Sequence, residues 1–352
     1  MDALSVPAVE DVAWLRLDEP SAVGGARRTV EQLATQLGAA EVRAAEIGIA
    51  VTEIASNVQR HGGGGTLLVR AVRDVDTAVV EVVAVDSGPG IADLGAAMRD
   101  RSSTAGTLGI GMGAIARMAQ SVEIATTPER GTVLVAGFDL QRGRPQAAVA
   151  RPVDAAGITR ALAGEDVCGD AYATRSHGRG FSLMVADGSG HGPLAAAAST
   201  AAVRTFLDPG RAVEPAAEVL ARVHGALSGT RGAAVAVAEV DPEAETVRFA
   251  GIGNIAGAVL SAGGKRSMVS LGGVAGFRNP TIRTFEYAYP PGAVVVLHSD
   301  GVRARWSEAD VRSLVGRAPI LLAATLLRDA GIRHDDACVL VGRAAPAEGA
   351  PS

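Results

Sequence analysis

The stretch that decides the fold of the second half is Val185-Ala186-Asp187-Gly188-Ser189-Gly190-His191-Gly192. An apolar run typical of a buried strand, 181–186, ends at an acid, and a glycine-rich turn then leads into an alanine-rich helical pattern over 193–207. The sequence therefore places a carboxylate, that of Asp187, at the end of a strand.

Further acids occupy the same kind of position in this half. Asp170 follows a glycine, Asp300 closes an apolar run, and the pair Asp335-Asp336 opens another. Carboxylates at adjoining strand ends repel one another, and hard divalent cations are the usual charge that holds them together. An aspartate before glycine is also a common turn residue, so each acid alone indicates only a turn. Their recurrence beside apolar strands favours a metal site.

Composition limits the classes of function. The chain has 352 residues, enough for two domains, and a net charge of −5 with 3% aromatic residues, which disfavours nucleic acid as a partner. The two cysteines, Cys168 and Cys338, lack metal-ligand spacing. No uninterrupted apolar segment reaches membrane length and no leader pattern opens the chain. We therefore expect a cytoplasmic protein that does not use a membrane.

The first half begins with helical patterns over 21–37 and 41–61. In the second pattern an apolar stripe runs from Ile47 to Val58, and Glu53 and Asn57 lie one turn apart beside it. A solvated polar face would explain these two residues equally well. We interpret His61 as a helix-end residue.

Two glycine-rich segments follow strands expected at 66–72 and 78–85. The first is Asp86-Ser87-Gly88-Pro89-Gly90. An acid at a strand end can accept a hydrogen bond from the exocyclic amine of a flat ring, and the glycines after it let the chain pass close beneath that ring. The second is Gly106-Thr107-Leu108-Gly109-Ile110-Gly111-Met112-Gly113, which opens a helix over 114–120 and can cradle phosphate.

In this order, these motifs resemble the GHKL ATP-binding superfamily, and within it the small serine kinases and anti-sigma factors of the RsbT type. The resemblance implies a Bergerat α/β sandwich that binds ATP and Mg²⁺ and transfers phosphate to a serine or threonine of a partner protein. It implies that Asp86 binds adenine, Asn57 holds Mg²⁺ and Glu53 activates the attacking hydroxyl. The nucleotide-binding residues it implies are Asn57, Asp86, Gly88, Gly90, Gly109, Gly111 and Gly113. A nucleotide-dependent binding module that gates the second half, and a plain ATPase, remain alternatives.

A short segment without apolar periodicity divides the chain. We expect a first domain over 1–140, a linker over 141–152, a second domain over 153–345 and a tail over 346–352. The second domain should hold antiparallel strands with helices on both sides, which makes the fold class of the whole chain α+β. Its expected strands are 159–162, 171–174, 181–186, 233–240, 246–251, 256–261, 281–287, 293–298 and 337–341, and its expected helices are 193–207, 215–227 and 318–329.

The second half resembles the metal-dependent PPM serine/threonine phosphatases of the sporulation-stage-II-E (SpoIIE) type and their small member RsbX. The stretches that carry the resemblance are Cys168-Gly169-Asp170, Ala186-Asp187-Gly188-Ser189-Gly190-His191-Gly192, Arg231-Gly232-Ala233, Gly253-Asn254, His298-Ser299-Asp300-Gly301 and Asp335-Asp336. The resemblance implies an αββα sandwich with two Mn²⁺ or Mg²⁺ ions that generate hydroxide.

By this resemblance Asp187 is shared by both ions, and the carbonyl of Gly188 completes one site. The second ion binds Asp300 and one acid of the terminal pair, for which the family's register favours Asp335 with Asp336 as its neighbour. The resemblance also implies that Asp170 binds a metal directly or through water. His191 is a candidate proton donor, and a role in starting the next helix explains it as well.

The whole chain thus resembles an RsbT-type kinase fused to an RsbX-type phosphatase. In the partner-switching systems where those families act, the two activities set the phosphorylation of STAS-domain proteins and so control a sigma-factor regulator. The resemblance implies a STAS-type anti-sigma antagonist or a stressosome-like protein as the substrate, and a sigma-factor regulator as a further partner.

Overall fold

The structure is a computed structural model that describes residues 8–74, 77–99, 111–141, 153–178, 180–208, 214–277, 280–332 and 334–345. The chain divides into two compact units, one within residues 7–148 and the other within residues 149–352. None of the helices in the described part of the chain combines the length and apolar character needed to span a membrane.

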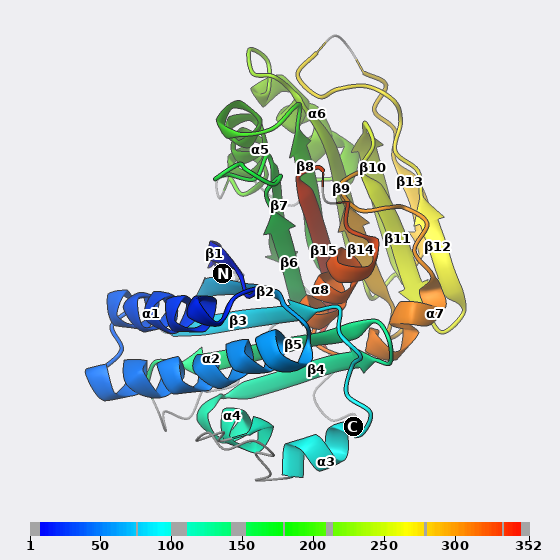
Figure 1. The fold of residues 1–352 in the computed structure, drawn as a ribbon. Coiled ribbons are helices and arrows are strands. Elements are labelled where there is room, and N and C mark those ends of the chain that lie inside the picture. The colour runs from blue at the N-terminus through cyan, green and yellow to red at the C-terminus, as the bar shows by residue number, and fades with distance from the viewer. Residues whose placement is uncertain are drawn as a thin grey trace. The chain divides into compact units, whose positions relative to one another are not determined.

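The first unit is built on a five-stranded antiparallel sheet with the strand order β1-β2-β3-β5-β4 (Figure 1). Its central strand β3 ends at Asp86, and Gly65 at the start of β2 pairs with that residue. The strands are β1 (Ala8–Arg16), β2 (Gly65–Arg73), β3 (Ala78–Asp86), β4 (Ser121–Thr127) and β5 (Gly131–Asp139).

Helices α1 and α2 pack on this sheet through one apolar cluster, to which α4 contributes Ile115. The expected stripe on α2, from Ile47 to Val58, is buried there, as the helical spacing of its residues predicts. Arg43, at the start of α2, donates to the carbonyl oxygens of Asp139 and Met118, which fixes the ends of β5 and α4 against this helix. The helices are α1 (Pro20–Gln36), α2 (Glu41–His61), α3 (Leu94–Arg99) and α4 (Met112–Met118).

The second unit contains two five-stranded antiparallel sheets, with the orders β13-β10-β9-β8-β7 and β12-β11-β14-β15-β6. Their inner faces share one apolar cluster, in which Phe181, Val185 and Phe249 of the first sheet lie with Leu297 and Leu340 of the second. The strands are β6 (Val153–Arg160), β7 (Asp170–His177), β8 (Gly180–Gly188), β9 (Ala233–Asp241), β10 (Thr246–Ile252), β11 (Ala256–Ser261), β12 (Gly264–Met268), β13 (Phe285–Ala288), β14 (Val294–His298) and β15 (Ala337–Ala344).

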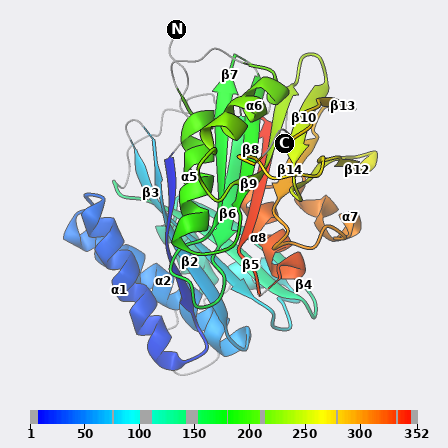
Figure 2. The same cartoon turned by 90° about the horizontal axis from the view of Figure 1, so that it is seen from above.

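Helices cover the outer faces of this sandwich (Figure 2). α5 and α6 pack on the sheet of β7 to β10 through a second apolar cluster, and α8 packs on β6 and β15. The expected α+β class and αββα arrangement are therefore confirmed. The helices are α5 (Pro193–Phe206), α6 (Ala216–Ala226), α7 (Glu308–Val311) and α8 (Pro319–Ala330), and a 3-10 turn, Arg312–Leu314, follows α7.

The differences from the expected elements lie mainly at sheet edges. Strands β1, β4 and β12 were not expected and each is an edge strand, and two other edge strands, β6 and β13, are displaced from the expected ranges 159–162 and 281–287. The short helices α3 and α7 were also not expected. Edge strands bury less of their surface, so their sequences need less of the apolar character from which a strand is recognised.

A close contact between the two sheets of the second unit gives a test of this packing. A Cβ atom on Gly157 of β6 would lie 2.6 Å from the ring of Tyr172 on β7, a distance that van der Waals repulsion forbids. We predict that Gly157→Ala lowers the free energy of unfolding by about 1–3 kcal/mol. Chemical denaturation of the purified protein measures this change.

The matched control is Gly225→Ala in α6, where an added Cβ meets no atom within 4 Å. This substitution should leave stability unchanged or raise it by roughly 0.5–1 kcal/mol, because alanine favours helix. Equal stability of the two variants would contradict the packing described for β6 and β7.

Candidate nucleotide pocket and metal centre

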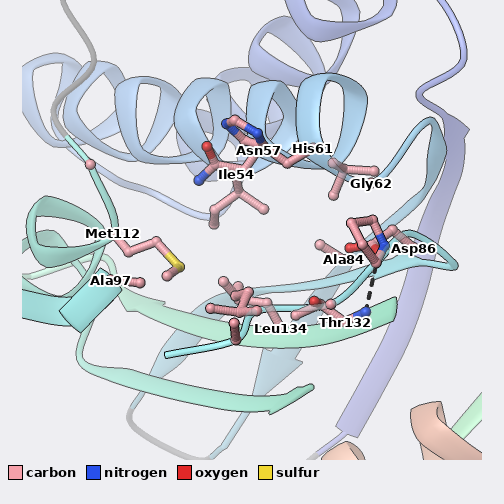
Figure 3. Close-up of a pocket in the computed structure, with 16 residues that line it drawn as sticks. Ile54, Asn57, His61, Gly62, Ala84, Asp86, Ala97, Met112, Thr132 and Leu134 are labelled. Atoms are coloured by element: carbon pink, nitrogen blue, oxygen red, sulfur yellow. Dashed lines mark hydrogen bonds between the residues drawn. The ribbon is translucent and has the colours of Figure 1, made fainter. Parts of the chain in front are cut away.

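A cavity of about 580 Å³ lies in the first unit between the C-terminal half of α2 and the strands β3 and β5 (Figure 3). Asn57 and His61 face it from the helix, and Asp86, Thr132 and Leu134 border it from the strand side. The described residues that line it are Ile54, Asn57, Val58, His61, Gly62, Ala84, Asp86, Pro89, Gly90, Ile91, Ala92, Ala97, Gly111, Met112, Thr132 and Leu134.

Asp86 is held in a fixed orientation at one end of this cavity. Its Oδ1 accepts hydrogen bonds from the backbone amides of Gly88 (2.9 Å) and Thr132 (3.1 Å), and the residue is 8% exposed. Among the described residues its Oδ2 has no hydrogen-bond partner. A carboxylate that borders a cavity with one oxygen already fixed by backbone amides is suited to accept from an amine on a flat ring.

Glycines make room for this carboxylate. A Cβ on Gly62 would lie 2.5 Å from Cβ of Asp86, and a Cβ on Gly88 would lie 2.7 Å from Cα of Gly62. Gly131, with φ of 95°, passes so close to Asp86 that a Cβ there would meet the aspartate's carbonyl oxygen. Glycine is thus required where the end of α2 and the turns near Asp86 approach one another.

The predicted nucleotide residues are only partly brought together. Asn57, Asp86, Gly90 and Gly111 line the cavity. Gly88 acts through its amide on Asp86, Gly113 lies in the first turn of α4, and Gly109 lies outside the described residues. Glu53, one turn before Asn57 on α2, is not a lining residue of this cavity.

Some lining residues were not singled out in the sequence. His61 is the last residue of α2, as expected, and it also lines the cavity because it follows Asn57 by one helical turn. Thr132 is brought in by the pairing of β5 with β3, and Ile54 and Leu134 belong to the apolar core as well as to the cavity. A residue placed by strand pairing, or one shared between the core and a cavity, has no local sequence pattern that marks it as a lining residue.

The predicted metal acids come from both sheets of the second unit. Asp170 opens β7 and stands opposite Asp187 at the end of β8. Asp300 follows β14, and Asp335 and Asp336 directly precede β15, its partner strand. The antiparallel pairing therefore brings these strand ends to one end of the sandwich.

The carboxyl groups are close enough to shift one another's pKa. Burial, and then the charges of Asp170 and Asp300, raise the pKa of Asp187 to about 9, and a hydrogen bond to Asp300 favours its protonated form. Burial raises the pKa of Asp170 to about 7, with Asp336, Asp300 and Asp335 adding to the shift and a hydrogen bond from Ser299 opposing it. Burial and then Asp300 also raise the pKa of Asp335. Ionising them together is unfavourable without a compensating positive charge.

Two buried oxygens show that this cluster fits a cation. Oδ2 of Asp170 and Oδ2 of Asp336 are buried and have no hydrogen-bond partner among the described residues. An unpaired buried carboxylate oxygen is costly, and a divalent ion is the ligand that carboxylates at this density accept. No group of three or more His, Cys, Asp or Glu side chains in the described ranges already stands at the distances of a formed metal site.

Neighbouring polar groups hold the acids in place. Asn254 donates to Oδ2 of Asp300 at 2.6 Å, and the amide of Cys338 donates to the Ser299 hydroxyl at 2.9 Å. The backbone at Gly301 also packs closely against that of Asp336, since a Cβ on Gly301 would collide with the carbonyl oxygen of Asp336. Both cysteines are free thiols.

His191 lies in the turn after Asp187 and is exposed. Its Nδ1 lies 2.6 Å from Oε1 of Glu165, which comes from the loop between β6 and β7. Glu165 was not predicted as a site residue, because a glutamate in a loop has no periodicity or spacing to distinguish it.

Comparisons with known proteins find separate matches for the two halves of the chain. Residues 17–137 match the family model described as histidine kinase-like ATPase domain, and residues 177–344 match that of Stage II sporulation protein E (SpoIIE). The serine/threonine-protein kinase RsbT of Bacillus subtilis (strain 168) is 29% identical over 128 residues, which cover 36% of this chain and 96% of RsbT.

The phosphoserine phosphatase RsbX of the same organism is 24% identical over 183 residues, which cover 51% of this chain and 89% of RsbX. A solved structure from work on the bacterial stressosome, a modular system adapted to control secondary messenger signalling, is 29% identical with a TM-score of 0.50. That match covers 54% of this chain and 99% of the solved chain. Residues 17–137 are thus a histidine kinase-like ATPase domain, and residues 177–344 are a SpoIIE domain of the PPM phosphatase class, joined in one chain.

Proposed function

We propose that the second half is a metal-dependent phosphatase that removes phosphate from phosphoserine or phosphothreonine of a partner protein. The observation that carries this proposal is the cluster of acids from both sheets, whose buried Asp170 and Asp187 ionise only at a raised pKa. Such a cluster favours binding of divalent cations, which is the first requirement of this chemistry.

Each acid has a distinct part in this proposal. Asp187 would be shared by the two Mn²⁺ or Mg²⁺ ions, and the carbonyl of Gly188 would complete one site. Asp300 and Asp335 would hold the second ion, and Asp170 would bind a metal directly or through water. When bound, the ions lower the pKa of water and screen phosphate oxygens. Asn254 orients Asp300, and Asp336 uses one oxygen to accept from the amide of Leu162. His191 gives a proton to the leaving seryl oxygen.

For the first half we infer ATP binding with Mg²⁺ and transfer of phosphate to a serine or threonine. The free oxygen of Asp86 accepts from the adenine amine, Asn57 holds Mg²⁺ and Glu53 activates the hydroxyl. The cavity beside the anchored Asp86 supports nucleotide binding directly. The likeness to RsbT supports transfer.

A second candidate for the first half is a nucleotide-dependent module that binds a partner and gates the phosphatase without transfer. It is supported by the anchored Asp86 and the cavity beside it, which would serve nucleotide binding whether or not phosphate is transferred. The module needs only the anchored carboxylate and the glycine turns around it.

The partner in both proposals is a STAS-type anti-sigma antagonist or a stressosome-like protein in the cytoplasm, with a sigma-factor regulator as a further partner. This follows the likeness to RsbT and RsbX and to a protein of the bacterial stressosome. The first half would then phosphorylate or bind one regulatory protein, and the second half would remove phosphate from it.

Metal binding can be tested on stability alone. Asp187→Asn removes a charge that its acidic neighbours disfavour, so the metal-free variant should unfold at a higher temperature than the metal-free wild type, by about 2–4 °C for each kcal/mol gained. Mn²⁺ should raise the melting temperature of the wild type and fail to do so for the variant. Differential scanning calorimetry with and without EDTA measures both effects.

The control Glu218→Gln, an exposed acid in the first turn of α6, should keep the Mn²⁺-induced rise. In parallel, Asp187→Ala and Asp300→Ala should abolish Mn²⁺-dependent hydrolysis of p-nitrophenyl phosphate. Full activity in either alanine variant would show that these acids do not form the centre.

Nucleotide recognition is tested by changing both partners of one hydrogen bond. Asp86→Asn keeps an acceptor for the two backbone amides but turns an NH₂ group toward the adenine amine, which should weaken ATP binding roughly 5- to 150-fold. ITP carries a carbonyl oxygen in place of that amine, so the variant should lose the preference of the wild type for ATP over ITP. Calorimetric titration with both nucleotides measures this, and Ser87→Ala is the exposed neighbouring control.

Phosphate transfer is tested where the second half cannot reverse it. In an Asp187→Ala background, radiolabelled ATP should label a STAS partner, and adding Glu53→Ala should slow labelling about 10²- to 10⁴-fold with ATP binding intact. ATP binding without any labelling would support the module instead. Release of free phosphate without a protein acceptor would indicate a plain ATPase.

A further inference from the structure

We propose that Glu165 positions His191 as the proton donor of the phosphatase half, which deepens the function proposed for that half and rests on it. The geometry that points to this role is the 2.6 Å contact between Oε1 of Glu165 and Nδ1 of His191. The glutamate side chain is 27% exposed and the histidine 59%, so the ring keeps a face open to a substrate.

The loop that carries Glu165 starts from the acid cluster itself. The amide of Leu162 donates to Oδ1 of Asp336 at 2.8 Å, and the amide of Glu165 donates to the carbonyl oxygen of Leu162 at 2.9 Å. Asp336 is 3% exposed and therefore has little freedom to move. One turn of backbone thus ties the position of Glu165 to a buried member of the cluster.

The loop that carries His191 is shaped to receive this carboxylate. Gly190 and Gly192 flank the histidine with φ of 93° and 72°, a backbone conformation that glycine favours. A Cβ on Gly192 would lie 2.8 Å from Oε2 of Glu165, so the absence of a side chain there leaves space for the second carboxylate oxygen. Both oxygens of Glu165 are therefore placed by the turn that follows Asp187.

The pair stands beside the acids rather than apart from them. A charge on His191 acts on the carboxyl group of Asp335 and opposes the rise of its pKa. Asp335 is one of the acids assigned to the second ion.

The hydrogen bond fixes which nitrogen donates to the substrate. A carboxylate only accepts, so Nδ1 carries the hydrogen of this contact and Nε2 is the nitrogen left for the reaction. As the bond between phosphorus and the seryl oxygen breaks, Nε2 of the imidazolium gives its proton to that oxygen. The oxygen of a water molecule forms the new bond to phosphorus, and that water releases one of its protons to solvent. The products are the alcohol and inorganic phosphate, and the ring regains a proton from solvent.

Stability alone does not account for the pair. Exposed ion pairs of this kind contribute little to folding. Removing Glu165 should therefore leave the melting temperature almost unchanged and act on one property, the transfer of a proton to the leaving group.

The test compares two leaving groups in the full chain with Mn²⁺. Nitrophenolate leaves p-nitrophenyl phosphate without a proton, whereas the alkoxide of a phosphoserine peptide requires one. We expect His191→Gln to lower kcat for the peptide by about 10²- to 10⁴-fold and to affect p-nitrophenyl phosphate far less. Glu165→Ala should lower kcat for the peptide by roughly tenfold, again with a much smaller effect on p-nitrophenyl phosphate. Glu165→Gln still accepts a hydrogen bond from Nδ1 and should restore most of the peptide kcat.

Controls separate positioning from charge and from folding. Asp166→Asn removes an acid from the same loop that is exposed and should leave both rates unchanged. The rise of the melting temperature with Mn²⁺ should persist in the Glu165 variants. Adding Glu165→Ala to His191→Gln should cause no further loss, because the glutamate acts only through the histidine.

Equal losses on the two substrates, or additive losses in the double variant, would overturn the positioning role and leave the phosphatase assignment intact. A wild-type chain without Mn²⁺-dependent hydrolysis of either substrate would overturn both. Unchanged peptide hydrolysis in Glu165→Ala would also overturn the positioning role.

Discussion

Repulsion among carboxylates gathered at one end of the sandwich is the constraint on which the second half depends. Asp170 and Asp187 face each other across β7 and β8, and Asp300 and Asp335 come from the facing sheet. Burial and neighbouring charges raise the pKa of Asp170, Asp187 and Asp335, so their ionised forms are disfavoured without a cation. The apolar core between the sheets fixes the strands and so forces their ends together, and the free energy of that burial is what keeps the acids in proximity before any cation binds.

The first half uses a strand-end acid in a different way. Asp86 is also buried where β3 ends, but two backbone amides occupy one of its oxygens and glycines leave the other facing a cavity. Its side chain is therefore held in one orientation, whereas the acids of the second half raise one another's pKa. Recognition of a flat ring needs the first arrangement and capture of divalent ions needs the second. The same local motif, an acid closing an apolar strand, supports two chemistries because its neighbours differ.

These neighbours also explain what the sequence could and could not predict. Interior strands such as β8, β9 and β14 carry apolar runs and were expected close to their observed ranges, whereas the edge strands β1, β4 and β12 were not. The strand-end acids were predicted because a local pattern marks them. Glu165 has no such pattern. Its position depends on the hydrogen bond from the amide of Leu162 to Asp336, and these two residues lie near the start and the end of the domain's sequence. Residue spacing therefore does not predict a site residue whose position depends only on contacts between segments far apart in sequence.

The two halves oppose each other chemically if both act on one serine. A full cycle of transfer and hydrolysis would convert ATP and water to ADP and phosphate and leave the partner unchanged. A chain with both activities is therefore effective only if substrate or nucleotide binding separates them in time, or if they act on different residues. The gating module avoids this conflict, because a bound nucleotide then changes affinity without reversing the hydrolysis.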